Sequence, residues 1–117
     1  MQIFSNVVRG LGAALDLYHA RHRVIGQNLA NVETPGYRAL DLDFGSALER
    51  AFDGAADDAA PPEPVVDLLS PVKIDGNSVD LELETTRLAE NSLRIVALSR
   101  ILARKYAGLK EAIAELR

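Results

Sequence analysis

Apolar residues recur at alternating spacings of four and three along both ends of the 117-residue chain. This spacing places side chains on one helix face and is typical of helices that pack along a coiled-coil-like seam. The N-terminal set comprises Phe4, Val8, Leu11, Leu15, Tyr18, His22, Ile25, Leu29 and Val32. The C-terminal set comprises Leu81, Thr85, Leu88, Ser92, Ile95, Ser99, Leu102, Tyr106, Leu109, Ile113 and Leu116. The pattern predicts helices over residues 1–33 and 78–117, and Leu98 and Ile101, off the stripe, predict a second apolar face.

The start of the second helix is marked by turn-forming and capping residues. Asp75-Gly76-Asn77 is typical of a turn, and Asn77 or Ser78 is expected to cap the first exposed amides. Acidic residues of the first turn, Glu84 among them, suit the positive end of the helix dipole.

A specific turn follows the first helix. Pro35 and Gly36 fit the central positions of a type II turn, because Pro fixes the first φ angle and Gly accepts a positive φ. Thr34 precedes Pro, so the helix must end before it. Asn28 and Asn31 lie in the last helical turn, where their amides can bond to unpaired carbonyls or to a neighbouring chain.

The segment 34–52 is predicted to contain this turn, an extended stretch and a short helix. Leu40, Leu42 and Phe44 alternate with aspartates, which indicates an extended segment with one buried face. Ser46 and Glu49 fit a capping box for a helix ending near residue 52.

The segment 53–77 is predicted to be linker-like. Residues 53–64 read DGAADDAAPPEP, which is the small, acidic and Pro-rich composition of a solvated linker. Val65-Val66 and Leu68-Leu69 are expected to add an extended apolar patch. The whole chain, 1–117, is then one all-α domain in which the two long helices pair as an antiparallel hairpin around an irregular middle. Two helices bury little surface, so we expect other subunits to cover the remaining stripes.

Composition narrows the function further. A net charge of −4 argues against a nucleic-acid binder, and the absence of Cys excludes disulfides and thiolate metal sites. No apolar run is long enough to span a bilayer, and the N-terminus does not resemble a cleavable signal peptide.

Catalytic and cofactor chemistry is not indicated. Asp16, His19 and His22 are spaced by three on one helix, but His22 occupies a seam position, so a partly buried structural histidine is favoured over a metal ligand. The basic clusters at 21–23 and 104–105 are typical of solvated helix faces rather than phosphate sites. We expect no enzyme activity and no cofactor.

The stretch from Asn28 to Arg38, NLANVETPGYR, resembles the signature of the bacterial flagellar rod and hook family of axial proteins. The ending at 41–44, DLDF, and the brevity of the chain are most similar to the proximal rod members of that family. GNSVDLE at 76–82, followed by LAEN at 88–91, resembles the start of the family's C-terminal helix. The resemblance covers residues 1–52 and 73–117. The positions that match its motifs are Asn28, Leu29, Ala30, Asn31, Thr34, Pro35, Gly36, Tyr37, Leu42, Phe44, Asn77, Val79, Asp80, Glu90 and Asn91.

The resemblance implies a structural subunit of the periplasmic rod of the flagellar basal body. Such subunits are exported through the flagellar type III secretion channel without a cleaved signal and assemble into a torque-transmitting helical tube. The implied partners are other copies of the chain, other rod proteins, the adaptor to the MS ring and the export gate. The motif residues above would then lie at subunit interfaces. Phe4 and Val8 match the family's export-gate signal, although the helical seam alone also explains them. A soluble helical-hairpin adaptor that binds a partner helix is the alternative.

Overall fold

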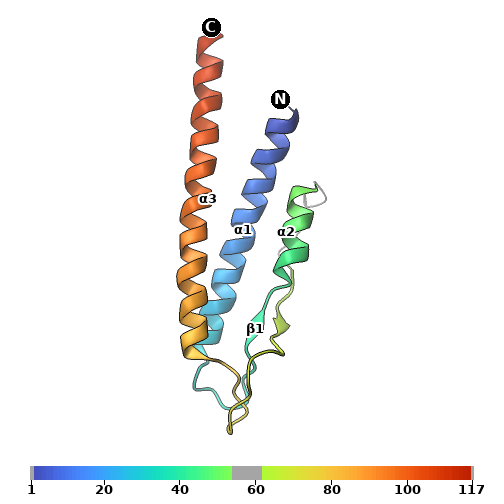
Figure 1. The fold of residues 1–117 in the computed structure, drawn as a ribbon, viewed down its shortest axis with the longest axis vertical. Helices are drawn as coiled ribbons and strands as arrows, with labels where there is room; N and C mark the ends of the chain where they lie inside the picture. Colours follow the sequence, from blue (N-terminus) through green and yellow to red (C-terminus); the bar gives the residue numbers. More distant parts are fainter. Residues whose placement is uncertain (1, 54–61, 117) are drawn as a thin grey trace.

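The computed structural model describes residues 2–53 and 62–116 of the chain. In these residues the elements are, in order, α1 (Gln2–Ala30), β1 (Leu40–Asp41), α2 (Phe44–Phe52), β2 (Val65–Val66) and α3 (Leu81–Glu115). The molecule measures 67 × 25 × 16 Å, and α1 runs antiparallel to α3 with α2 on its other flank (Figure 1). The prediction of a mainly helical chain, with two long paired helices and an irregular middle, is confirmed.

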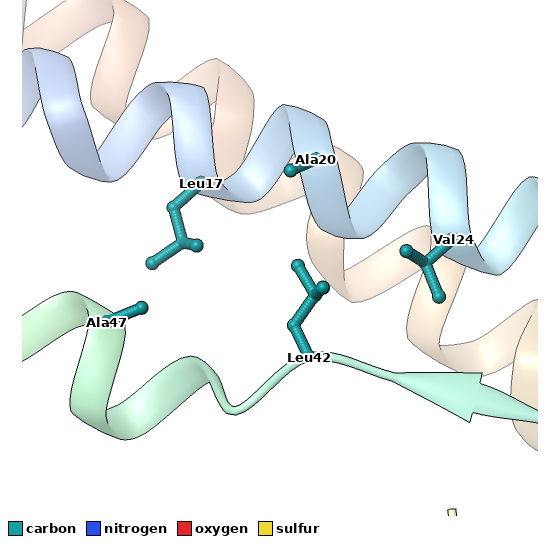
Figure 2. Packing of buried hydrophobic residues seen from close by; sticks show 5 residues of the cluster. All are labelled: Leu17, Ala20, Val24, Leu42 and Ala47. Atoms are coloured by element: carbon teal, nitrogen blue, oxygen red, sulfur yellow. The ribbon is translucent and has the colours of Figure 1, made fainter. Parts of the chain in front are cut away.

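The α1 helix packs on two sides. Every residue of its predicted seam is buried or half-buried. A second face, which the sequence pattern did not reveal, packs against α2 and the segment before it. Figure 2 shows the side chains at the centre of this contact, which are all less than 9% exposed: Leu17, Ala20, Val24, Leu42 and Ala47. Its alanines let α2 approach α1 closely, so small residues conceal this face from a search for large apolar ones.

The seam of α3 differs from the predicted one in every second position. Glu84, Asn91, Leu98 and Lys105 are buried or half-buried there, whereas Thr85, Ser99 and Tyr106 of the predicted stripe are exposed and Ser92 is half-buried. Leu88, Ile95, Leu102 and Leu109 occupy the seam as predicted. The prediction missed the shift because two of the true seam positions carry charge and one carries an amide. Leu98 therefore belongs to the seam, while Ile101 lies off it as predicted.

The distal end of α3 extends past α1. Figure 1 shows α3 continuing beyond the N-terminal end of α1, whose Phe4 ring lies 5.9 Å from the Lys105 ammonium. Ile113 and Leu116 continue the stripe of Leu109, yet they are 48% and 87% exposed because α1 ends before reaching them. We call residues 110–116 the overhang.

Both predicted caps are wrong. The N-cap of α3 is Asp80, whose carboxylate accepts from the Leu83 amide at 3.2 Å, because Asn77 and Ser78 use their side chains elsewhere. The N-cap of α2 is Asp43, so Ser46 lies inside the helix and no capping box forms. Helix α2 nevertheless ends at Phe52, as expected.

The extended part of the middle forms a short antiparallel ladder. Leu40 pairs with Val66 and Asp41 with Val65, and the Asp67 amide adds a hydrogen bond of 2.9 Å to the Ala39 carbonyl. The ladder confirms extended structure at 40–41 and 65–66. Two expectations were wrong here: Phe44 already belongs to α2, and residues 68–69 form a turn. The predicted linker at 53–64 lies largely outside the described residues.

Candidate functional site

The turn after α1 has the predicted geometry. Gly36 adopts φ = 77°, and the Tyr37 amide donates to the Thr34 carbonyl at 3.2 Å. These are the features of a type II turn with Pro35 and Gly36 at its centre. Helix α1 ends at Ala30, before the residue that precedes proline, as predicted.

A second glycine turn packs directly on the first. Gly76 has φ = 83°, and its amide donates to the Lys73 carbonyl at 2.9 Å. The Gly36 amide donates to the Asp75 carbonyl at 3.0 Å, which links the two turns. The segments 28–40 and 73–80 thus form one unit, which we call the loop junction.

Asn77 holds the loop junction together from the inside. Its side chain is fully buried, and its Nδ2 donates to the carbonyls of Asn31 and Thr34 at 2.9 and 2.8 Å. Its Oδ1 accepts from the Val79 amide at 2.7 Å. One side-chain amide therefore bonds to three backbone groups: the Val79 amide, and two carbonyls that each also accept a backbone amide.

Asn28 bonds to the backbone of strand β1 with its side-chain amide. It is also fully buried; its Nδ2 donates to the Leu40 carbonyl at 2.8 Å, and its Oδ1 accepts from the Leu40 amide at 3.0 Å. The Asn28 side chain pairs with both polar groups of one residue, as a neighbouring strand would. Tyr37 adds a hydroxyl bond to the same Oδ1 at 3.4 Å.

Three further polar side chains of the loop junction bond within the chain. Asn31 donates to the Gln27 carbonyl at 2.9 Å, which closes the last turn of α1 as predicted. The Thr34 hydroxyl donates to Asn31 Oδ1 at 3.1 Å. Ser78, fully buried, accepts from the Ala39 amide at 2.7 Å, and its own amide donates to the Tyr37 carbonyl.

A partly buried ion cluster lies beside the loop junction. Glu84 is 1% exposed, and its Oε1 accepts from Arg87 Nη1 at 3.2 Å. Arg87 also reaches Asp67 Oδ2 at 3.4 Å, and Arg21 of α1 lies 3.5 Å from Asp41. These five residues, Arg21, Asp41, Asp67, Glu84 and Arg87, join α1, β1, the segment after β2, and α3. We call them the ion cluster.

Burial and charge shift three pKa values here. Burial, together with the carboxylates of Asp41 and Asp67, raises the pKa of Glu84 against the opposing effects of the Asn28 amide and Arg87. Burial also acts on Asp67, but bonds from the Leu69 amide and Ser70 hydroxyl, with Arg87, lower the pKa of Asp67 overall. Burial and the charge of Glu84 raise the pKa of Tyr37.

Asn91, seven residues after Glu84 on α3, bonds to α1. Its Nδ2 donates to the Tyr18 carbonyl at 2.9 Å and lies 3.2 Å from His22 Nδ1. His22 is half-buried, in agreement with the predicted structural histidine. Arg21 and Lys105, expected on solvated faces, instead lie 5.1 Å over the Phe44 ring and 5.9 Å over the Phe4 ring.

The motif positions divide by exposure. Asn28, Leu42, Asn77, Val79 and Asn91 are buried inside the chain. Leu29, Asn31, Tyr37 and Phe44 are half-buried, and Ala30, Thr34, Pro35, Gly36, Asp80 and Glu90 are exposed. The loop junction thus brings two motifs, separated by about 40 residues in sequence, into one structure. Phe4 and Val8 lie at the far end of α1, half-buried.

Sequence reasoning missed the roles of Ser78, Glu84, Asp67 and Arg87. The sequence predicts a helix-dipole role for Glu84, although Glu84 precedes Leu88 by four on the seam. That register was the one available signal, because an acidic residue at a seam position implies a buried partner.

Two classes of site are not found in the described residues. In residues 2–53 and 62–116 no three His, Asp or Glu side chains group as metal ligands. Within the same ranges, no helix has the length and apolar character needed to cross a membrane.

Comparisons with known proteins identify the family. No protein-family model matches the chain. It is 32% identical over 116 residues to the flagellar basal body rod protein FlgB of Salmonella typhimurium, covering 82% of this chain and 84% of that protein. It is 36% identical over 113 residues to FlgB of Cereibacter sphaeroides, covering 86% and 88%. The Escherichia coli FlgB is 33% identical over 101 residues, covering 69% and 73%. The chain, with its paired terminal helices and its glycine-turn loop junction, therefore belongs to the family of flagellar basal body rod proteins FlgB.

Proposed function

We propose that the chain builds the proximal rod as a mechanical subunit, packing against further copies of itself and against other rod proteins. The observation that carries this proposal is the apolar surface that the described part of the chain leaves uncovered at both poles. Soluble monomers rarely expose large contiguous apolar patches, so such surfaces mark contacts with partners.

One pole carries the overhang. Its Ile113 and Leu116 continue the helical seam beyond the described part of α1 and remain exposed. The opposite end carries an apolar patch along residues 65–74, where the exposed side chains are Val65, Val66, Leu68, Leu69, Val72 and Ile74. Two different surfaces on one chain favour a head-to-tail contact, which yields a helical filament when it does not close into a ring.

Grooves along the helices offer side-to-side contacts. One, of about 620 Å³, is lined by Phe4, Val8, Gly12, Tyr106 and Leu109 among others. Another, of about 280 Å³, lies between Tyr18, Leu48, Phe52 and Ile101. Because α2 and α3 flank α1, each groove has helical walls of the kind that receive a neighbouring helix.

The exposed motif residues of the turn, Thr34, Pro35 and Gly36, are proposed to contact the adjacent subunit. The buried motif asparagines contribute to this contact indirectly, because they fix the loop that carries the turn. Phe4 and Val8 are proposed to engage the export gate before the helices pair. Assembly through the type III export channel into the periplasmic rod, next to the MS-ring adaptor, completes the proposal.

Deletion of the gene tests this function. We expect loss of motility and truncated basal bodies in electron micrographs, restored by the wild-type gene on a plasmid. The double variant Ile113→Ser/Leu116→Ser should be exported yet fail to restore the rod. Intact filaments in the deletion strain would instead favour the helical-hairpin adaptor.

A further inference from the structure

The ion cluster holds more negative than positive groups. Among the described residues, Asp41, Asp67 and Glu84 face two guanidinium groups, those of Arg21 and Arg87. With every member ionised the cluster would carry one uncompensated negative charge, since three negative and two positive charges leave −1. An uncompensated charge away from water is costly, and a buried carboxyl commonly takes up a proton instead.

Glu84 is the member placed to hold that proton. Its side chain is 1% exposed, whereas that of Asp41 is 27% exposed and can be stabilised by water. Asp67 receives bonds from the Leu69 amide, the Ser70 hydroxyl and both Arg87 nitrogens. Glu84 Oε2 is buried and accepts no hydrogen bond of good geometry from the described residues, which leaves it the oxygen that a proton would occupy.

The groups around Glu84 come from every element packed against it. Asn28 and Arg21 lie on α1, Tyr37 in the turn loop and Asp41 on β1, with Asp67 after β2 and Arg87 on α3. Glu90 and Arg94 line a small neighbouring cavity, but both are exposed and solvated. The cluster therefore forms only where β1 and the segment after β2 lie against α1 and α3.

We propose that the loop junction closes with uptake of a proton at Glu84, so that docking of residues 62–80 onto α1 and α3 is a proton-linked step. The sign follows from the direction of the shift. Because the pKa of Glu84 is raised on folding, the closed state binds more protons than the open state above the ordinary value of 4.5. Closure is then strongest below that value and weakens as pH rises from 4.5 toward the raised folded value. The limit is tenfold per pH unit for one proton.

The amide of Ala39 reports closure directly. It is buried, and it donates across the loop junction to Ser78 Oγ, 39 residues away. Its hydrogen-exchange protection, corrected for the intrinsic pH dependence of exchange, measures the open fraction without global unfolding. We would record it by nuclear magnetic resonance on the full chain between pH 4.5 and 7.5.

In the wild type we expect protection at Ala39 to fall with rising pH, by up to tenfold per unit. Glu84→Gln keeps the shape and the acceptor for Arg87 but cannot ionise, so its protection should stay constant. Glu82→Gln, at an exposed first-turn position of the same helix, is the matched control and should behave as wild type. An equal pH slope in Glu84→Gln and wild type would overturn the proposal, as would protection that rises with pH in the wild type.

If the loop junction of Glu84→Gln does not close at any pH, the proposal is tested by the carboxyl ¹³C chemical shift of Glu84 in the wild type, followed as a function of pH. A titration midpoint above 4.5 supports the proposal, and a midpoint at or below it refutes it. Neither readout depends on rod assembly, so the inference stands or fails separately from the proposed function.

Discussion

Gly76 stands against Gly36 so closely that a β-carbon on Gly76 would lie 3.2 Å from the Gly36 Cα atom. Both glycines have positive φ, at 83° and 77°. The two turns meet backbone to backbone. The positive φ favours glycine at both positions, and at Gly76 the nearby Gly36 backbone also leaves little room for a side chain.

Replacing Gly76 with alanine should therefore destabilise the protein. The added methyl group meets the Gly36 backbone, and the positive φ adds strain of about 1–3 kcal/mol. Urea unfolding followed by circular dichroism measures the loss. Gly26→Ala is the matched control: Gly26 is exposed within α1, nothing lies within 4 Å of its added Cβ, and alanine should stabilise the helix by up to about 1 kcal/mol. Equal effects of the two substitutions would contradict this account.

Gly36→Val should block rod assembly while leaving export intact. No atom lies within 4 Å of a Cβ at this position, so the obstacle is the backbone angle alone, which a β-branched residue strongly disfavours. Motility in soft agar and immunoblotting of exported protein separate the two steps. Gly36→Asn should retain more motility, because Asn tolerates the left-handed region better than Val. Normal swimming of the Val variant would show that the turn is dispensable.

Asn77→Ala should lower the stability of the protein more than Asn31→Ala does, because Asn77 is fully buried and Asn31 is half-buried. It removes the bonds to the Asn31 and Thr34 carbonyls, which each keep one backbone bond, and it leaves the buried Val79 amide without an acceptor among the described residues, at about 1–3 kcal/mol for that group before relaxation. Asn31→Ala, at a half-buried position with one backbone bond, should lose about 1 kcal/mol. Asn77→Asp should be at least as damaging as alanine, since it sets an oxygen against two carbonyl oxygens. Thermal unfolding of the three variants gives the order.

Acid should weaken the protein through Asp67. Since the pKa of Asp67 is lowered on folding, its contribution is present above the ordinary value of 3.8 and is lost as pH falls toward the folded value. Asp67→Asn should remove part of the stability loss seen between pH 4.5 and 2. Asp53→Asn, at an exposed position, serves as the control and should lose as much stability at low pH as the wild type does. If Asp67→Asn lost as much stability at low pH as the wild type does, groups other than Asp67 would be responsible for the loss.

The overhang should matter for assembly and not for the isolated subunit. Ile113→Ser/Leu116→Ser removes side chains that touch nothing within the described chain's core, so its unfolding midpoint should match the wild type. Leu102→Ser, inside the seam, should lower the midpoint as a buried apolar loss does. Sedimentation at increasing concentration then compares self-association. A destabilised overhang variant would mean that these residues pack within the subunit.

The long helices, their pairing and the type II turn could be predicted because each rests on local sequence: periodicity, or the conformational limits of Pro and Gly. The caps could not, because Asn77 and Ser78 have good capping side chains that a distant segment claims. The α2 face of α1 escaped notice since alanines carry little hydrophobic signal. Glu84 and Asn91 were absent from the predicted seam for a related reason: polar residues enter a helical interface only where distant groups satisfy them, and a single sequence does not show those groups. Hydrophobic periodicity does not reveal hydrogen bonds and ion pairs between such polar residues and distant groups.

From the antiparallel pairing we expect a particular order of folding. The Asn77–Asn31 bond joins residues 46 apart, and the Asn91–Tyr18 bond joins residues 73 apart. Once the first contact has closed, the second requires only the two helical segments between them to pair, because most of the loop entropy is already lost. The hairpin should thus grow from the middle of the chain toward its two ends. The N-terminal turn that carries Phe4 and Val8 is then the last part of α1 to be covered and the first to fray.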